Sequence, residues 1–484
     1  MKHKLFYFLY LVFTIFSLSF VSCKKDNDTT VKPVVTTGYQ QYGTPFADLP
    51  ATEDIIMYEV NLRAFSSTGN LRGVINKISH LKSLGVNVIW LMPIYPDGEV
   101  NSVNSPYCIK DFKAVGSEYG TLTDLRELTD AAHAQGMAVI LDWVANHTSW
   151  DNPWISNKSW YSQDGSGNIV HPPGTNWMDV ADLNYSNTIM KDSMIDAMKF
   201  WVLEANTDGF RCDYADGVPY SFWKQAMDTL RAIPNRKLVM LAEGDRGDHF
   251  NAGFDLHFSW SFYGAVKSVF DGQTASKLYD THETEYSSVP SGKQTLRFTT
   301  NHDESAWDAT PMTLFDGEQG ALAASVVTVF MGGVPLLYTG QEVGRIATVP
   351  FFSNSTIDWN AHSGMLTSYQ KILHIYSNSL AAHRGTVTDY STADVSAFSR
   401  EYLGEELFVI VNCRQNDVTY SLSTDIQNTV WINSMDQSEV NLGTNIQLSS
   451  REFVILSRPN PTVNVRSALT FIKKSLDHNP FTNR

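Results

Sequence analysis

Asp208-Gly209-Phe210-Arg211-Cys212-Asp213-Tyr214-Ala215 is typical of a short apolar strand that ends in an arginine and a carboxylate. Residues two apart on a strand point to the same side, so Arg211 and Asp213 should lie together. A guanidinium favours the ionised form of a neighbouring carboxyl group and lowers its pKa, and an ionised, positioned carboxylate can act as a nucleophile. A buried ion pair that only braces the strand is the alternative, and this stretch alone leaves both open.

Similar strands occur along much of the chain. From about residue 52, short β-rich runs alternate with helical patterns, which is typical of βα units around a parallel sheet. The predicted strands are 55–63, 86–93, 137–145, 208–213, 238–243, 254–258, 295–300 and 335–338. The predicted helices are 122–135, 187–205, 219–233, 317–331 and 368–383, with Thr123 as the N-cap and Gly136 as the C-terminal end of the first. Eight strands with interleaved helices predict an α/β fold, the closed (β/α)8 barrel, whose catalytic groups emerge from the C-terminal strand ends.

The remaining segments predict the domain organisation. Residues 1–22 have a basic start and an apolar run, which indicates an export signal, and 23–44 resemble a flexible tether. The barrel should span 45–385 and carry an inserted subdomain, 148–186, after its third strand. Strand patterns with polar turns over 386–457 predict a C-terminal antiparallel β-sandwich domain, and 458–484 form a polar tail.

The net charge and the cysteines limit which partners and which cellular locations the sequence predicts. A net charge of −15 argues against nucleic acid. Phe20-Val21-Ser22-Cys23 resembles a bacterial lipobox, which predicts lipid attachment at Cys23 and an outer-membrane or cell-surface lipoprotein, with the periplasmic face also open. A plain signal peptide with an incidental cysteine is the alternative. We expect Cys108, Cys212 and Cys413 to be free, mostly buried thiols, because their spacing matches no metal motif.

Three more predicted strands end in polar residues that an apolar core would not require. They end in Leu141-Asp142-Trp143-Val144-Ala145-Asn146-His147, Met240-Leu241-Ala242-Glu243-Gly244-Asp245 and Phe298-Thr299-Thr300-Asn301-His302-Asp303. A single histidine or glutamate at a strand end is usually structural or solvated. Ionisable groups at four strand ends of one barrel, however, indicate an active site.

The four stretches follow the order D-x-x-x-N-H, G-F-R-x-D, an isolated Glu and N-H-D. This pattern resembles the α-amylase family of glycoside hydrolases (family 13), over about residues 50–457. The resemblance implies that Asp213 is the nucleophile, Glu243 the general acid/base and Asp303 the transition-state stabiliser. It also implies substrate-binding roles for four further residues: Arg211, His147, His302, and Tyr107, which would stack beneath the sugar ring.

The residue types fit this chemistry. A retaining glycosidase needs two carboxyl groups about 5–5.5 Å apart, one ionised and one protonated. We expect Arg211 to keep Asp213 ionised, and Glu243 to keep its proton because its own motif contains no cation.

Departures from the family pattern limit what else the resemblance implies. Many relatives have Lys-His three and four residues after the nucleophile, whereas this chain has Asp216 and Gly217. No cofactor is needed for the chemistry. A structural calcium ion is the one metal that the resemblance implies, held by Asn146 and Asp182 with backbone carbonyls.

The sequence therefore predicts a monomeric, lipid-anchored enzyme that hydrolyses α-1,4-glucosidic bonds in starch, glycogen or maltooligosaccharides with retention. Val180-Ala181-Asp182-Leu183-Asn184 matches neither the Q-P-D-L-N nor the M-P-K-L-N form found in relatives of other specificity. Other activities of the family (cyclomaltodextrinase, α-glucosidase or transglycosylase) remain alternatives. So does a non-catalytic glucan-binding lipoprotein, against which the intact set of three acids argues.

Overall fold

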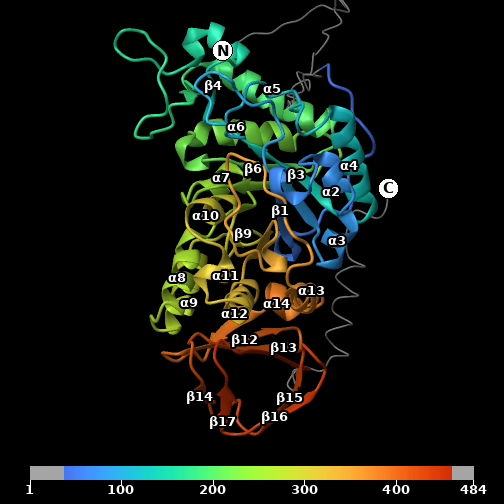
Figure 1. Ribbon diagram of the computed structural model, residues 1–484, viewed down its shortest axis with the longest axis vertical. Helices are drawn as coiled ribbons and strands as arrows, with labels where there is room; N and C mark the ends of the chain where they lie inside the picture. The colour runs from blue at the N-terminus through green and yellow to red at the C-terminus, as the bar shows by residue number, and fades with distance from the viewer. Residues whose placement is uncertain (1–37, 460–484) are drawn as a thin grey trace, which may run out of the picture. The chain divides into compact units, whose positions relative to one another are not determined.

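The computed structural model describes residues 38–459, and it confirms the predicted barrel (Figure 1). Eight parallel strands close in the order β1-β2-β3-β6-β7-β8-β9-β10, and each overlaps a predicted strand. Their bounds are β1 Met57–Val60, β2 Val88–Leu91, β3 Ala138–Trp143, β6 Gly209–Cys212, β7 Val239–Ala242, β8 Leu256–Phe258, β9 Gln294–Arg297 and β10 Val334–Tyr338.

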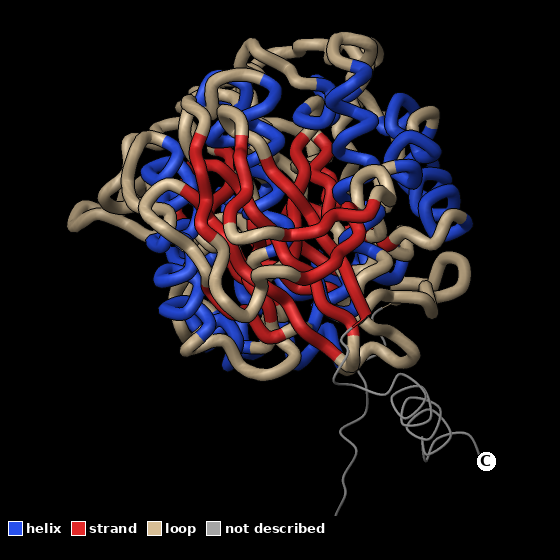
Figure 2. The backbone as a smooth tube through the Cα atoms, turned by 90° about the horizontal axis from the view of Figure 1, so that it is seen from below, coloured by secondary structure: helices blue, strands red, loops and turns tan. Residues whose placement is uncertain are grey.

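Helices surround the barrel, and in Figure 2, which is seen from the side of the C-terminal domain, they lie around and behind the strands. They are α1 Leu62–Phe65, α2 Leu71–Ile75, α3 Ile78–Ser83, α4 Leu122–Ala134, α5 Thr188–Glu204, α6 Tyr220–Arg231, α7 His249–Ala252, α8 Trp260–Phe270, α9 Ser276–Tyr286, α10 His302–Trp307, α11 Pro311–Leu314, α12 Glu318–Phe330, α13 Ser363–Ser377 and α14 Leu380–Arg384. The prediction of one helix over 368–383 was wrong, because a new helix begins after Ser379. The hydroxyl of Ser379 accepts a hydrogen bond from the backbone N–H of Ala382 and so caps α14.

The start of α4 also differs from its prediction. Thr121, not Thr123, is the N-cap, because its hydroxyl accepts from the backbone N–H of Asp124 while the Asp124 carboxylate accepts from the backbone N–H of Thr121. This reciprocal pair satisfies two N–H groups that the first turn would otherwise leave unpaired. Gly136, with φ +72°, follows the helix in the left-handed conformation, as predicted.

Side chains alternate between the two faces of each strand, and this alternation determines which residues point towards the barrel axis. Met57, Val88 and Ile140 belong to an apolar cluster inside the barrel, whereas their chain neighbours pack outward under the helices. Two residues further along β1 and β3, on the same inner side, the sequence places Glu59 and Asp142, and both are fully buried. The interior therefore changes from apolar to charged at the C-terminal end of the strands.

The predicted insert contains an antiparallel pair, β4 His147–Ser149 and β5 Val180–Asp182. Trp150, Trp154 and Trp160 are partly buried and pack against the main apolar core. Most of the tryptophans of the insert therefore have a structural environment.

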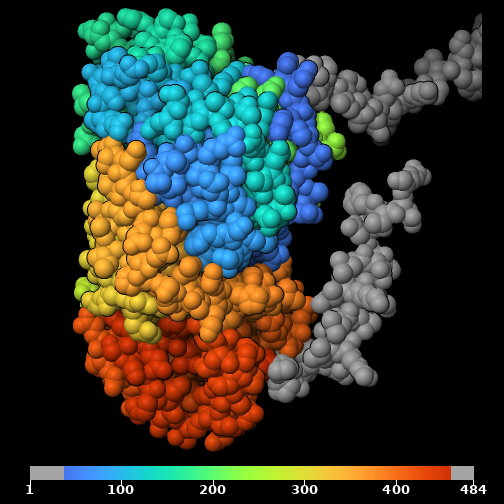
Figure 3. Space-filling view, turned by 45° about the vertical axis from the view of Figure 1, so that its right-hand side comes forward, coloured from blue at the N-terminus to red at the C-terminus, as the bar shows by residue number. Residues whose placement is uncertain are grey.

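The C-terminal domain consists of a six-stranded antiparallel sheet, β11-β12-β13-β18-β15-β16, and a separate pair, β14-β17. The bounds are β11 Thr386–Asp389, β12 Val395–Tyr402, β13 Glu405–Asn412, β14 Val418–Ser421, β15 Thr429–Asn433, β16 Glu439–Leu442, β17 Asn445–Leu448 and β18 Phe453–Pro459. The domain packs directly on the barrel (Figure 3). Arg400 donates to the carbonyl of Phe330 at 3.2 Å, and Arg451 to that of Phe270 at 3.0 Å, so buried guanidinium groups bind the ends of barrel helices.

The C-terminal end of the predicted tether, 23–44, contacts helix α5. The Tyr39 hydroxyl donates to Asp196 at 2.5 Å, and the backbone N–H of Tyr42 donates to the carbonyl of Leu203 at 2.8 Å. Tyrosine supplies an apolar ring and a hydrogen-bonding hydroxyl, which is sufficient to fix this short segment on α5. The export signal, Cys23, most of the tether and nearly all of the tail lie outside the described residues.

Two further observations concern the described part of the chain. Cys108, Cys212 and Cys413 are free and buried, as predicted. Over residues 38–459, none of the helices combines the length and apolar character needed to cross a membrane.

Candidate active site

A cavity of about 570 Å³, here called the central cavity, opens at the C-terminal ends of the barrel strands. Its lining includes six of the predicted site residues: Asp213, Glu243, Asp303, Tyr107, His147 and His302. Arg211, the seventh, lies fully buried beneath Asp213 and Glu243. The structure thus brings together residues separated by almost 200 positions in the chain.

The guanidinium of Arg211 contacts three carboxylates at once. Its Nη1 atom lies 2.7 Å from Asp142 Oδ1 and 3.0 Å from Asp213 Oδ1, and its Nη2 atom lies 2.8 Å from Glu243 Oε1. The Trp90 ring covers the guanidinium, whose central carbon lies 5.0 Å from the ring centroid. A buried cation surrounded in this way fixes the positions of the acids on β3, β6 and β7 relative to each other.

The expectation that Arg211 lowers the pKa of Asp213 was wrong, whereas the raised pKa of Glu243 agrees with its expected protonation, although for a different reason than the composition of its motif. Glu243 does have a cation beside it, because the guanidinium of Arg211 reaches across from β6 to the neighbouring strand end. The pKa of Asp213 is raised rather than lowered, because burial outweighs the opposing charge of Arg211 and the charge of Glu243 adds to the increase. Burial raises the pKa of Glu243 as well, with Arg211 opposing and Asp303 adding. Two buried carboxyl groups that share one guanidinium and repel each other are suited to hold one proton between them.

His302 forms a second charged centre. Its Nδ1 atom lies 2.5 Å from Glu59 Oε1, and its Nε2 atom lies 2.8 Å from the Tyr107 hydroxyl and 3.4 Å from Asp303 Oδ2. Burial alone would lower the pKa of His302, but the charges of Asp303 and Glu59 raise it to about 9. His302 is therefore an imidazolium at neutral pH, with both ring nitrogens donating.

Glu59 and Asp142 were not among the predicted site residues. Asp142 accepts hydrogen bonds from the Tyr107 hydroxyl at 2.9 Å and from Trp90 Nε1 at 3.1 Å, in addition to its contact with Arg211. Asp142 is the first residue of the D-x-x-x-N-H stretch, to which the resemblance assigns no role. Both Glu59 and Asp142 could have been recognised as site residues because each is a charged residue at an inward position of an apolar strand. Such a residue must have a buried partner.

Tyr107 and His147 complete the predicted set. The Tyr107 ring stacks on His302, with ring centroids 5.3 Å apart and an interplanar angle of 18°. Burial lowers the pKa of His147 to about 4, so this histidine is neutral, in contrast to His302. The two histidines therefore offer the cavity one neutral and one charged ring.

The expected calcium ion is not supported by the residues around Asn146 and Asp182. The Asn146 amide lies 3.2 Å from His147 Nδ1, and Asp182 belongs to β5, where burial raises its pKa. Calcium prefers six to eight oxygen ligands. Among residues 38–459, no group of three or more His, Cys, Asp or Glu side chains is arranged to hold a metal ion. Calcium binding stays a prediction, and no chemical step below depends on it.

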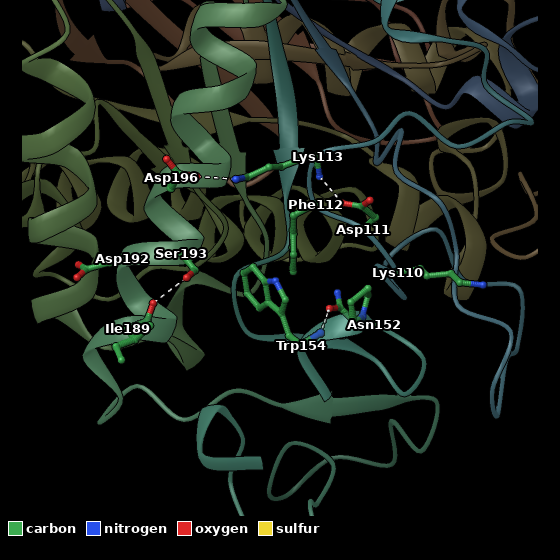
Figure 4. A pocket seen from close by; sticks show the side chains of 11 residues that line it. Lys110, Asp111, Phe112, Lys113, Asn152, Trp154, Ile189, Asp192, Ser193 and Asp196 are labelled. Atoms are coloured by element: carbon green, nitrogen blue, oxygen red, sulfur yellow. Dashed lines mark hydrogen bonds and ion pairs between the residues drawn. The ribbon is translucent and has the colours of Figure 1, made fainter. Parts of the chain in front are cut away.

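A second cavity, of about 510 Å³, lies between the insert and α5 (Figure 4). Its charged groups are already paired, since Lys113 contacts Asp196 at 2.5 Å and Gln225 donates to Asp192 at 3.0 Å. It offers no converging set of acids like that of the central cavity, which we take as the candidate active site.

Comparisons with known proteins agree with this geometry. Residues 14–168 match the family model described as alpha amylase, catalytic domain. The chain is similar to alpha-amylase MalA of Haloarcula japonica, with 29% identity over 314 residues, and this match covers 62% of the chain and 45% of the relative. It is also similar to the probable oligo-1,6-glucosidase 2 of Bacillus subtilis, with 26% identity over 385 residues, 62% of the chain and 66% of the relative. The chain thus spans about half to two thirds of these curated relatives.

A solved structure is similar to this chain over nearly the full length of that structure. The crystal structure of an alpha-amylase from Lactobacillus plantarum superposes with a TM-score of 0.76 and 26% identity, covering 84% of this chain and 99% of that one.

Glu59→Gln tests the charged centre at His302. Removing the carboxylate removes one of the two charges that raise the histidine pKa, so the pKa of His302 should fall from about 9 towards its ordinary value of 6.5. Titration of the His302 ring by NMR, assigned by comparison with His302→Gln, measures this value. Glu59→Asp, which keeps the charge, is the control and should titrate near the wild-type value. An unaltered His302 titration in Glu59→Gln would contradict the assignment.

Proposed function

This chain belongs to the α-amylase family of glycoside hydrolases, and on that premise we propose that it hydrolyses α-1,4-glucosidic bonds of starch, glycogen or maltooligosaccharides with retention of configuration. One observation carries the proposal: Asp213, Glu243 and Asp303 line one cavity above the guanidinium of Arg211. Retention requires a nucleophilic carboxylate and a separate proton donor at the same anomeric centre.

In the first step, an Asp213 oxygen attacks the anomeric carbon while Glu243 gives its proton to the leaving oxygen. The hydrogen bond from Arg211 Nη1 at 3.0 Å favours the ionised form of Asp213, and the charge of Asp303 favours the protonated form of Glu243. In the second step, Glu243 takes a proton from water as the water oxygen attacks the same carbon and releases Asp213. Both carboxyl groups thereby return to their starting states.

The remaining charged groups act on the sugar as positive charge develops. Asp303 is assigned to accept hydrogen bonds from ring hydroxyls, and protonated His302, which lies 3.4 Å from Asp303, to share its Nε2–H between the Tyr107 hydroxyl and a neighbouring sugar hydroxyl. Such interactions lower the barrier to the extent that they strengthen in the transition state. Neutral His147 supplies a hydrogen bond without adding charge.

The preference for α-1,4 over α-1,6 linkages is a more specific part of the proposal. The stretch Val180 to Asn184 supports α-1,4 cleavage, whereas the similarity to a probable oligo-1,6-glucosidase keeps α-1,6 cleavage as the alternative within the family. The products released from amylose, cyclodextrin and isomaltose separate these activities from one another. Binding without any product would instead support a glucan-binding protein.

Asp213→Asn and Glu243→Gln should each reduce the turnover of maltoheptaose by at least about 10³-fold, because each removes a group that takes part in the bond change. Turnover is measured by product release, and affinity for maltoheptaose by calorimetry, which should stay within about tenfold of wild type. A purified variant that keeps wild-type turnover would contradict the assigned role of the residue that it lacks.

We also propose that the chain is exported and anchored to the outer membrane or cell surface by a lipid on Cys23, as its lipobox-like sequence indicates. Cys23→Ala should move the protein from the membrane fraction to the soluble fraction, as measured by glucan-hydrolysing activity and immunoblot after cell fractionation. Cys413→Ala, which removes a buried thiol, is the matched control and should stay with the membranes. Continued membrane association of Cys23→Ala would refute the anchor.

A further inference from the structure

Trp307 is unusual among the aromatic side chains because 64% of its surface is exposed. It ends α10, the helix that begins with His302, and it lines the central cavity together with Phe351 and Phe352 from the loop after β10. Exposure of a tryptophan at the rim of a cavity carries a hydration cost that a merely structural role would avoid by burying the ring.

These rings form a continuous series, here called the aromatic ladder: Tyr107, Phe351, Phe352 and Trp307. Tyr107 and Phe351 have centroids 5.6 Å apart at 26°, and Phe351 and Trp307 are 5.6 Å apart at 36°. Phe352 packs against the edges of Phe351 and Trp307 at 5.1 and 5.7 Å. The ladder thus runs from the stacked Tyr107–His302 pair, next to the acids, to the exposed rim.

We propose that the aromatic ladder binds the glucosyl units of a substrate chain beyond the unit that reacts at the acids. Pyranose rings present apolar C–H faces with a polar edge of hydroxyls, and the exposed Trp307 ring with the neighbouring Phe351 and Phe352 rings offers a complementary apolar surface. Because the ladder is continuous with the candidate active site, a chain seated at the acids has the ladder as its next apolar surface. This inference rests on the proposed function and specifies its substrate as glucans several units long.

Trp307→Ala tests the ladder. The KM for maltoheptaose should rise about 3–10-fold, in line with the loss of one aromatic contact, while the KM for maltotriose rises by a smaller factor. Trp307→Phe should recover most of the difference. Tyr220→Ala, which removes an exposed aromatic ring of α6, is the matched control and should leave the ratio of the two KM values at its wild-type value.

An equal change in both KM values, or no change in either, would refute the proposal that the aromatic ladder binds the additional glucosyl units. Failure of the proposed function gives a different result, because wild-type protein would then release no product from either oligosaccharide.

A second, independent inference concerns Asp216, where this chain departs from the family pattern. Its carboxylate accepts from the backbone N–H groups of Asp245 and Arg246 at 3.4 and 3.3 Å, and it lies 2.6 Å from His249 Nε2. All three partners belong to the segment that follows Glu243. Gly244 has φ +149°, and a Cβ there would lie 2.4 Å from Asp216 Oδ1, so the close approach requires glycine.

The same turn holds Glu243 directly. The backbone N–H of Tyr214 donates to Glu243 Oε2 at 2.6 Å, and that of Ala215 donates to the Glu243 carbonyl at 2.9 Å. Tyr214 has φ +41°, which is unfavourable for a residue with a side chain and persists only where the surroundings impose it. Gly217 makes room for the Tyr214 ring, since a Cβ there would lie 2.2 Å from a ring carbon.

We infer that Asp216 is a positioning residue that holds Glu243 in place for proton donation. It fastens the segment after Glu243 to the turn after Asp213, so that acid and nucleophile keep a fixed relation although they lie on different loops. A displacement of about 1 Å at a catalytic group can cost about 100-fold in rate.

Asp216→Ala should lower kcat/KM for maltoheptaose by at least about tenfold, because that leaving group needs the proton from Glu243. For α-maltosyl fluoride, whose leaving group needs little protonation, kcat/KM should fall far less. Asp216→Asn, which can still accept from the backbone, should recover part of the loss. Asp245→Ala, at the neighbouring exposed acid, is the matched control and should retain wild-type values for both substrates.

An equal fall for both substrates at an unaltered melting temperature would overturn the positioning role, because it would indicate damage to the nucleophile as well. Inactivity of the wild type on both substrates would instead count against the proposed function.

Discussion

The contact of one buried guanidinium with three carboxylates is the constraint on which the site depends. Arg211 is fully buried, and Asp142, Asp213 and Glu243 all lie within 3.0 Å of its terminal nitrogens. Removing a charge from water costs several kcal/mol unless close partners replace the lost hydration, and for the buried guanidinium these three carboxylates are the partners. The cluster therefore fixes the site and limits how many protons it holds.

The barrel forms this cluster because side chains alternate between the inner and the outer face of each strand. Most inward-facing strand residues are apolar and fill the interior, whereas Glu59, Asp142 and Arg211 place buried charges near the C-terminal ends of β1, β3 and β6. Parallel strands bring successive C-terminal ends to one face, so charges far apart in the sequence meet without a special loop. Loops then extend the site, as the aromatic ladder and the turn at Asp216 illustrate.

Much of the fold and site followed from the sequence because the deciding features were local. Most barrel strands are compact apolar runs, and Asp213 and Glu243 follow such runs directly, whereas Asp303 belongs to an N-H-D motif a few residues after β9. Features that depend on partners from elsewhere could not be predicted. The contact between Arg211 and Glu243 can be predicted only if their strands are known to be neighbours. The importance of Glu59 can be predicted only if its contact with His302 is known.

Weak local signals explain the other errors. Thr121 and Thr123 are both acceptable N-caps by composition, and only the reciprocal bond with Asp124 distinguishes them. Tyr39 and Tyr42 stand in a polar segment that resembles a tether until their partners on the barrel are known.

Covalent trapping of the reaction intermediate identifies the carboxylate that attacks the anomeric carbon. A fluorinated maltosyl fluoride slows the second step of a retaining hydrolase, so the sugar accumulates on the nucleophile. Mass spectrometry of the digested protein should find the added mass on the peptide that contains Asp213, at the carboxylate held by Arg211. Label on Glu243, or no label while the protein still hydrolyses maltoheptaose, would contradict the account.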